Sequence, residues 1–97
     1  MNKYESVIIV KPKLKTSEIN TTIEKVDNAI KKVADITEKQ ELGLKKLAYE
    51  VKGNKEGYYL VYEFEVNEGK KEDAIREIEH FYRITDEIIK FIIVERD

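Results

Sequence analysis

The chain has 97 residues, which is enough for one compact domain with its own core but not for two. Hydrophobic residues make up 41% and charged residues 39%, which argues against a disordered chain and predicts high solubility. The net charge is -2, so any RNA partner would have to meet a local basic patch. Cysteine is absent, and the apolar run from Val7 to Val10 is too short for a signal peptide or a membrane span. We therefore expect a cytoplasmic protein with no membrane partner.

The first half of the chain predicts a strand, a helix and a long strand. Residues 4–11 are rich in β-branched side chains and stop at Pro12, which has no N–H to donate to a sheet. Apolar residues then recur at helical spacing from Ile19 to Val33, after an N-cap at Thr16 or Ser17. Residues 34–51 have the pattern of a second strand, and its polar first half is typical of a sheet edge.

The second half predicts a turn over residues 53–57, a strand over 58–66, a helix over 70–82 and a strand over 88–94. Each βαβ half of the resulting β-α-β-β-α-β order must cross over right-handed, which puts both helices on one face. This predicts an α+β, ferredoxin-like fold with a four-stranded antiparallel sheet in the order 4-1-3-2. We expect one such domain over residues 1–97.

The sheet of this fold should have one uncovered face. Strands one, three and four carry apolar residues on both faces, but the two helices cover only one of them. The uncovered patch predicts an interaction surface, and the alternative is a scatter of ordinary exposed apolar side chains. The residues that we assign to this partner interface are Val7, Ile9, Tyr59, Val61 and Glu63.

Two adjacent lysines interrupt the apolar pattern of residues 41–51, ELGLKKLAYEV. The odd spacing from Leu44 to Leu47 predicts a β-bulge at Lys45–Lys46 that keeps Leu42, Leu44, Leu47, Tyr49 and Val51 on one core-facing side. Two interpretations of the lysines remain open. They guard an edge strand against pairing with other chains, or they contact phosphates.

The same stretch, followed by GYY, resembles the signature region of the bacterial small-subunit ribosomal protein S-six family. That signature has an acidic or aromatic residue, Gly, two basic residues, Leu-Ala-Tyr and an aliphatic strand end. The likeness continues in KYE at residues 3–5, in Pro12 and in YRITDEIIKFIIV at residues 82–94, over nearly the whole chain. The chain departs from the family pattern at Glu50, where several members have proline, and at Gly69, in a longer approach to the second helix. Several members have a lysine near Gly53, where this chain has Lys52 and Lys55, and the sequence ends at Asp97 without the tail by which some members would contact a partner.

The resemblance implies the βαββαβ fold, no enzymatic activity and a structural role in the small ribosomal subunit. It implies binding to the central domain of small-subunit ribosomal RNA together with the small basic ribosomal protein S-eighteen, as a heterodimer. A net acidic chain suits a basic partner, because opposite charges favour their association.

For RNA we expect contacts to the phosphate backbone and no base readout, because a lysine is a point charge with little geometric selectivity. Lys3 and Lys90 lie on adjacent predicted strands and could form one patch, while the double lysine lies on the opposite edge. The residues that we assign to RNA binding are Lys3, Lys45, Lys46, Arg83 and Lys90.

Three other functions are known for domains with this order of elements or this kind of open sheet face. An RNA-recognition motif needs a second small residue that GYYLVYEFE lacks, which favours core packing for Tyr58 and Tyr62 and leaves Tyr59 open. An acylphosphatase-like hydrolase needs an arginine and a backbone cradle after the first strand, and KPKLKT has neither Gly nor Arg. A regulatory domain that senses a small molecule and dimerises through its open sheet face stays as the alternative. His80 has no Ser, Cys or second His at catalytic spacing, and the carboxylates have no spacing typical of metal ligands. We therefore expect no catalytic residue, metal, cofactor or small-molecule substrate.

Overall fold

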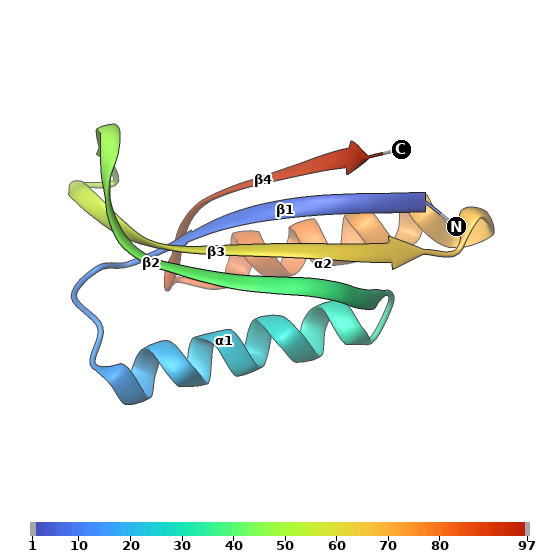
Figure 1. Cartoon of the computed structure of the whole chain (residues 1–97), viewed down its shortest axis with the longest axis horizontal. Helices are drawn as coiled ribbons and strands as arrows, with labels where there is room; N and C mark the ends of the chain where they lie inside the picture. Colours follow the sequence, from blue (N-terminus) through green and yellow to red (C-terminus); the bar gives the residue numbers. More distant parts are fainter. Residues whose placement is uncertain (1, 97) are drawn as a thin grey trace.

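The structure is a computed structural model that describes residues 2–96, and it has the predicted element order. Its elements are β1 (Asn2–Val10), α1 (Thr16–Lys31), β2 (Asp35–Val51), β3 (Asn54–Val66), a 3₁₀ turn (Glu68–Lys70), α2 (Lys71–Ile84) and β4 (Ile88–Arg96). The strands form one antiparallel sheet in the order β2-β3-β1-β4, which is the predicted order counted from the other edge. Both helices lie on one side of this sheet (Figure 1), so the ferredoxin-like α+β fold is confirmed.

The core lies between the sheet and the two helices. Because side chains alternate along a strand, the even-numbered residues of β1 and β3 face the helices and the odd-numbered ones face away. Residues from every layer are fully or almost fully buried there: Ile8, Val10, Val26, Ile30, Leu60, Tyr62, Phe64, Val66, Ala74, Ile78 and Tyr82. The helix side of the sheet is therefore occupied, and only the other side is available to a partner.

Helix α1 is placed by its apolar stripe and by a cap that differs from the predicted one. Its stripe recurs at helical spacing and is buried against the sheet: Ile23, Val26 and Ile30. The N-cap is Lys15, and not Thr16 or Ser17, because the helix already begins at Thr16. The Glu18 carboxylate accepts a hydrogen bond from the Lys15 N–H at 3.0 Å. That bond satisfies a backbone donor at the helix start, as in one half of a capping box.

Polar contacts also attach each helix to the sheet. The buried hydroxyls of Ser6 in β1 and Tyr82 in α2 share a hydrogen bond at 3.0 Å. The Tyr62 hydroxyl of β3 donates to Asp27 of α1 at 2.6 Å, and Lys39 of β2 donates to the same carboxylate at 3.0 Å. Burial raises the pKa of both tyrosines, so each keeps its proton at neutral pH, and the Tyr62 hydroxyl can donate to Asp27.

The β2–β3 turn is shorter than the predicted turn over residues 53–57. It consists of Lys52 and Gly53, with φ angles of 48° and 80°, between the paired residues Val51 and Asn54. Two central residues with positive φ are typical of the type I′ turn, whose twist matches that of the flanking strands. Gly57, which the sequence placed in the turn, lies within β3 and serves packing, because a Cβ there would collide with the Ile9 side chain.

Strand β2 does not contribute the predicted row of core residues. Three of them are largely exposed: Leu42 (42%), Leu44 (54%) and Tyr49 (64%). The predicted bulge at Lys45–Lys46 is wrong, because both lysines pair in regular register with β3. The register instead breaks just before Gly43, whose φ is 82°, and again between Lys46 and Val51. Figure 1 gives the physical reason for the exposure, since the second half of β2 curves away from the helix layer.

The end of the β2–β3 hairpin instead curves over the sheet face that the helices leave free (Figure 1). Leu47 approaches Gly57 on this side, beside Ile9. The Tyr49 hydroxyl accepts a hydrogen bond from Lys90 Nζ of β4 at 2.8 Å, and the ammonium lies 4.9 Å from the centre of the Tyr49 ring. The hairpin thus reaches past β3 and β1 to contact the far edge strand.

Candidate functional site

The open face, which is the sheet surface away from the helices, is apolar in its middle. Val7 of β1 lies between Val61 of β3 and Ile92 of β4 in the register of the sheet. Ile92 and its face neighbour Val94 remain 50% and 47% exposed. Half-buried and exposed apolar side chains that lie next to each other on three strands are typical of a surface that binds another molecule.

The predicted interface residues all lie on this open face, but they are not equally accessible. Val7, Tyr59, Val61 and Glu63 are half-buried. Ile9 is only 7% exposed, because the curved hairpin covers it. The accessible part of the open face therefore begins at Val7 and runs away from the hairpin.

An acidic row, formed by Glu5, Glu38 and Glu63, borders the apolar middle of the open face. Glu63 is paired in register with Glu5 of β1 on one side and with Glu38 of β2 on the other. A hydrogen bond with Glu38 raises the pKa of Glu63, and repulsion from the carboxylates of Glu38 and Glu5 raises it further. Arg96 offsets only part of this charge, through an ion pair with Glu5 at 2.9 Å. The row would favour a cationic partner.

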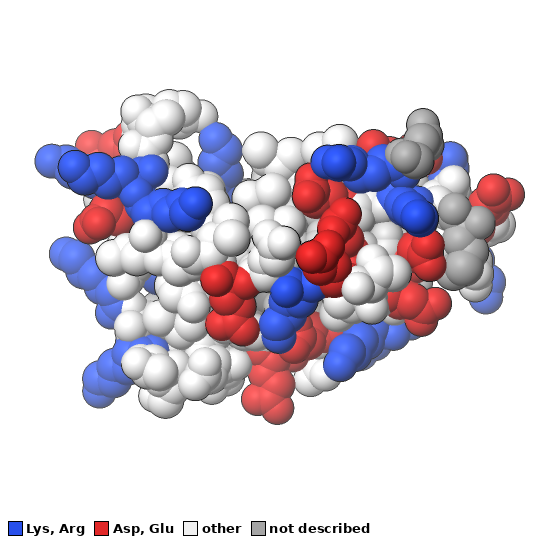
Figure 2. Space-filling view, viewed as in Figure 1, with Lys and Arg blue, Asp and Glu red and all other residues white. Residues whose placement is uncertain are grey.

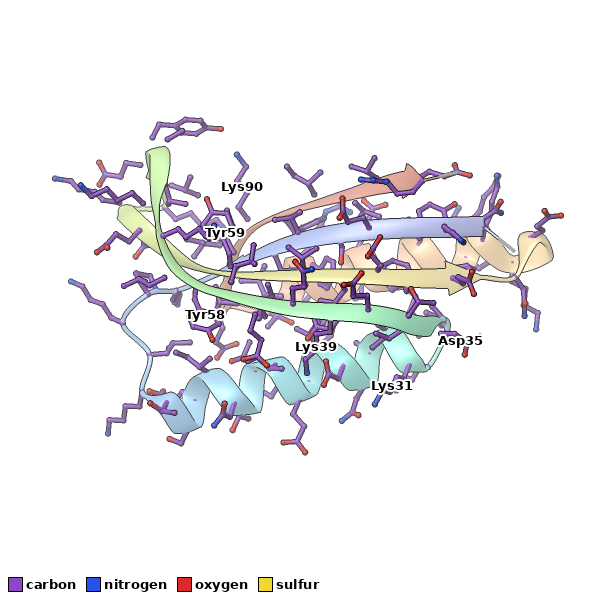
Figure 3. All side chains as sticks on the ribbon, viewed as in Figure 1. Lys31, Asp35, Lys39, Tyr58, Tyr59 and Lys90 are labelled. Carbon is purple, nitrogen blue, oxygen red and sulfur yellow. The ribbon has the colours of Figure 1, made fainter. Side chains whose placement is uncertain are left out.

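The residues predicted to bind RNA fall into two distant groups. Lys3 is paired with Arg96 in register, whereas Lys90 is paired with Ile9 towards the other end of β1, so Lys3 and Lys90 do not form one patch. Lys45 and Lys46 are exposed on the stem of the hairpin. The curved hairpin brings its end to Lys90, which the flat strand order had placed on the opposite edge (Figure 3).

Lys90 and Arg83, two of the predicted RNA-binding residues, line the same cavity of about 300 Å³. Lys52 of the hairpin turn is the third cation of its lining, and we call this group of Lys52, Arg83 and Lys90 the basic notch. Sequence analysis missed Lys52 as a binding residue, because only the curvature of the hairpin brings residue 52 next to β4. Figure 2 shows Lys and Arg side chains in the majority at the hairpin end, with some Asp and Glu among them, while Asp and Glu are more frequent over the middle of the molecule.

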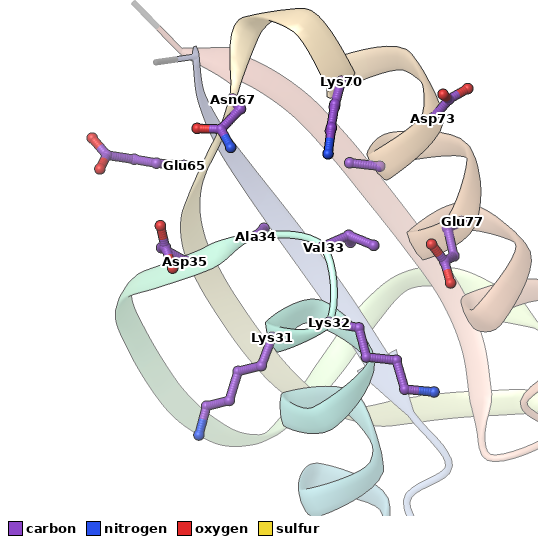
Figure 4. Close-up of a pocket in the computed structure, with 11 residues that line it drawn as sticks. Lys31, Lys32, Val33, Ala34, Asp35, Glu65, Asn67, Lys70, Asp73 and Glu77 are labelled. Atoms are coloured by element: carbon purple, nitrogen blue, oxygen red, sulfur yellow. The ribbon is translucent and has the colours of Figure 1, made fainter.

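A second cavity, of about 390 Å³, lies between the end of α1 and the start of α2 (Figure 4). Its charged lining mixes both signs: Lys31, Lys32, Asp35, Glu65, Lys70, Asp73 and Glu77. Lysines that share a cavity with carboxylates are largely neutralised, so this mixed cavity is not selective for an anion or a cation.

Residues 2–96 contain no group of His, Asp and Glu side chains arranged to hold a metal ion. Neither of the two helices in this part of the chain has the length and hydrophobicity that crossing a bilayer requires. The fold places the chain in the class of ferredoxin-like α+β domains whose two helices leave one sheet face open.

Comparisons with known proteins identify the family within this class. The family model described as ribosomal protein S6 matches residues 3–95. Small ribosomal subunit protein bS6 of Sulfurovum sp. is 38% identical over 98% of this chain and 72% of its own length. The protein of the same name from Helicobacter pylori (strain Shi470) is 36% identical, and the chain spans 65% of it. The crystal structure of 30S ribosomal protein S6 from Thermotoga maritima superposes with a TM-score of 0.89 at 32% identity, over 98% of this chain and 87% of that one.

The chain belongs to the ribosomal protein S6 family, which confirms the resemblance seen in the sequence. It is a protein of the small ribosomal subunit, and this places it on the ribosome in the bacterial cytoplasm, as predicted. The family is one of structural ribosomal proteins and is not an enzyme class.

Proposed function

We propose that this protein, as one domain over residues 1–97, binds the central domain of small-subunit ribosomal RNA as a heterodimer with the small basic ribosomal protein S-eighteen. It has no catalytic role in this proposal. The open face docks the protein partner, through Val7, Tyr59, Val61 and Glu63 with Ile9 beneath the hairpin. Lysines and an arginine contact RNA phosphates: Lys3, Lys45, Lys46, Arg83 and Lys90.

The observation that carries the proposal is the combination of an apolar middle and an acidic border on the open face. Val7, Val61 and Ile92 offer adjacent apolar surface, whose burial would stabilise a complex by about 25 cal/mol per Å² removed from water. The acidic row beside it would attract a basic partner and repel bare phosphate. A protein therefore fits this surface better than RNA does.

The hairpin end supports the RNA half of the proposal. Lys45 and Lys46 are exposed on paired backbone, and Lys90 is held by Tyr49. Cations in fixed positions suit contacts that set the orientation of RNA without reading its sequence. Lys3 lies at the other end of the sheet, so it would contribute a separate contact.

The test is a reconstitution with purified components. The protein, ribosomal protein S-eighteen from the same organism and a transcript of the central domain would be mixed pairwise and together, then measured by sedimentation and filter binding. We expect a one-to-one protein complex that survives high salt, weak RNA binding by the chain alone and much tighter binding by the pair. Absence of the protein complex together with a stable homodimer would contradict the proposal and favour the sensing domain.

A further inference from the structure

We propose that the basic notch formed by Lys52, Arg83 and Lys90 is a binding site for a single backbone phosphate of RNA. The inference rests on the proposed function, because it names the site at which the hairpin end would hold that RNA. Lys52 thereby joins the residues expected to contact RNA. The three cations would bind one phosphate together and would not act as independent surface charges.

The first argument is the composition of the cavity. Its three cations come from three different elements: the β2–β3 turn, the last turn of α2 and the start of β4. Tyr82, Ile88, Ile89 and Phe91 complete the lining, and none of the described residues that line it carries a carboxylate. An apolar floor keeps the local dielectric constant low, so an anion above it would be held more strongly than at an open surface.

The second argument is that two of the cations are already held in place. Lys90 donates to the Tyr49 hydroxyl at 2.8 Å and lies 4.9 Å from the centre of that ring. The Arg83 guanidinium lies 5.9 Å from the centre of the Phe91 ring and bonds Glu79 at 3.0 Å. Glu79 engages only one end of a guanidinium that has five N–H donors, so the remaining donors can face a phosphate. Cations that are already ordered lose less conformational entropy when a ligand binds.

The third argument comes from the backbone of Lys52. Its φ of 48° is in the left-handed region, where the first central residue of a type I′ turn is preferably Asn, Asp or Gly. A lysine is a less favourable residue for this turn. The turn therefore carries a residue that it does not favour, and it places that residue in the lining of the cavity.

The main experiment compares two triple variants of equal charge. One triple variant removes the three cations of the notch: Lys52→Gln, Arg83→Gln and Lys90→Gln. The matched control removes three cations from the mixed cavity instead: Lys31→Gln, Lys32→Gln and Lys70→Gln. Each protein would be paired with S-eighteen, and its affinity for the central-domain transcript would be measured over a range of salt concentrations.

We expect the notch variant to bind about tenfold more weakly or worse, because it loses charge-assisted hydrogen bonds. Its log–log salt slope should fall by roughly 0.7–0.9 for the one phosphate that is no longer neutralised. The control should stay close to the unmodified protein. Equal losses in the two variants would overturn the notch and leave the proposed function standing. A wild-type pair that binds no RNA would instead contradict the proposed function.

A second measurement tests the site without RNA. The free protein would be titrated with inorganic phosphate while its backbone amide signals are followed by nuclear magnetic resonance. We expect saturable shifts at Lys52, Arg83 and Lys90, with smaller shifts around the mixed cavity. Shifts of equal size at both cavities, or none that saturate, would overturn the proposal whatever the RNA result.

The single change Lys52→Asn separates binding from folding. Asn suits the left-handed turn better than Lys, so we expect the Tm to rise by about 2–5 °C. RNA affinity should nevertheless fall about three- to tenfold, because one cation of the notch is lost. A higher Tm with unchanged RNA affinity would mean that Lys52 is only a turn residue and would overturn its role in the notch.

Discussion

The middle of the open face and the hairpin end belong to the same sheet but offer opposite chemistry. The middle of the open face is apolar and bordered by the acidic row, whereas the hairpin end carries exposed lysines and the basic notch. Burial of apolar surface suits a protein partner, and fixed cations suit phosphates. The difference shows how a chain with a net charge of -2 can still present a local group of cations, because Lys52, Arg83 and Lys90 share a cavity whose described lining has no carboxylate.

The largest effect is expected from a charge placed in the apolar middle of the open face. Ile92→Asp should weaken the complex with S-eighteen by about a hundredfold or more, because a desolvated and unpaired carboxylate costs several kcal/mol. Folding should change little, since Ile92 is 50% exposed. Ile84→Asp is the matched control, because Ile84 is 62% exposed on α2, away from the open face. Isothermal titration calorimetry would measure both, and equal losses would mean that the open face is not the interface.

The next effect tests the contact that joins the two regions. Gly57→Ala should destabilise the fold by about 1–3 kcal/mol, because the added Cβ would collide with the Ile9 side chain and force the hairpin to shift. Gly69→Ala is the control, since nothing lies within 4 Å of a Cβ at that position, and it should change stability by less than about 1 kcal/mol. Urea unfolding measures both variants. If Gly57→Ala leaves the free energy of unfolding unchanged, the hairpin packs on the sheet less closely than the contact between Gly57 and Ile9 indicates.

A moderate effect is expected from the lysines on the hairpin stem. Lys45→Ala with Lys46→Ala should reduce RNA affinity about tenfold and lower the salt slope by roughly 0.7–0.9 per lost phosphate contact. Binding to S-eighteen should not change, because both lysines lie outside the apolar middle. The matched control changes two exposed lysines, one in α1 and one at its C-cap: Lys25→Ala with Lys32→Ala. It removes the same charge and should leave the salt slope unaltered. If the Lys45→Ala, Lys46→Ala variant also leaves the salt slope of RNA binding unaltered, these two lysines only protect the edge strand from pairing with other chains.

The smallest effect is expected from the acidic row, and it should have opposite signs in the free and bound states. The folded pKa of Glu63 is raised, so its contribution to stability is present below the unfolded pKa and is lost as the pH rises through the folded value. Glu63→Gln should therefore raise the Tm of the free protein slightly at neutral pH and reduce its dependence on pH in the acidic range. The same change should weaken the complex with S-eighteen by up to about fivefold. Thermal melts and calorimetry at several pH values measure both, and a lower Tm would contradict the repulsion between these carboxylates.

Much of the fold could be predicted because it follows from local patterns. The helical spacing of Ile23, Val26 and Ile30 and the alternation along β3 identified their elements, and the right-handed crossover rule then set the sheet order. The sheet face on which Val7 and Val61 lie was also predictable, because successive side chains of a strand point to opposite faces of the sheet. Family membership was predictable from the order and spacing of short motifs over the chain.

The prediction failed at β2, where local pattern and tertiary context disagree. Leu42, Leu44 and Tyr49 look like core residues in sequence, but this part of β2 leaves the helix layer. All three side chains stay largely exposed, although Tyr49 contacts Lys90. A strand pattern predicts which side chains share a face, but it does not show whether another element covers that face.

The sequence by itself determined the class of fold, the family and the open face, because these depend on periodicity, on the chain order of the elements and on short motifs. Only the tertiary structure decided that Lys90 lies beside Tyr49 and Lys52, that Lys3 lies far from them, and that Ile9 is covered. The physical reason is the curvature of one hairpin. The β2 register breaks at three points, two of them after Glu41, and the turn that follows has positive φ at both central residues. The curved hairpin carries residue 52 past two strands to the far edge of the sheet.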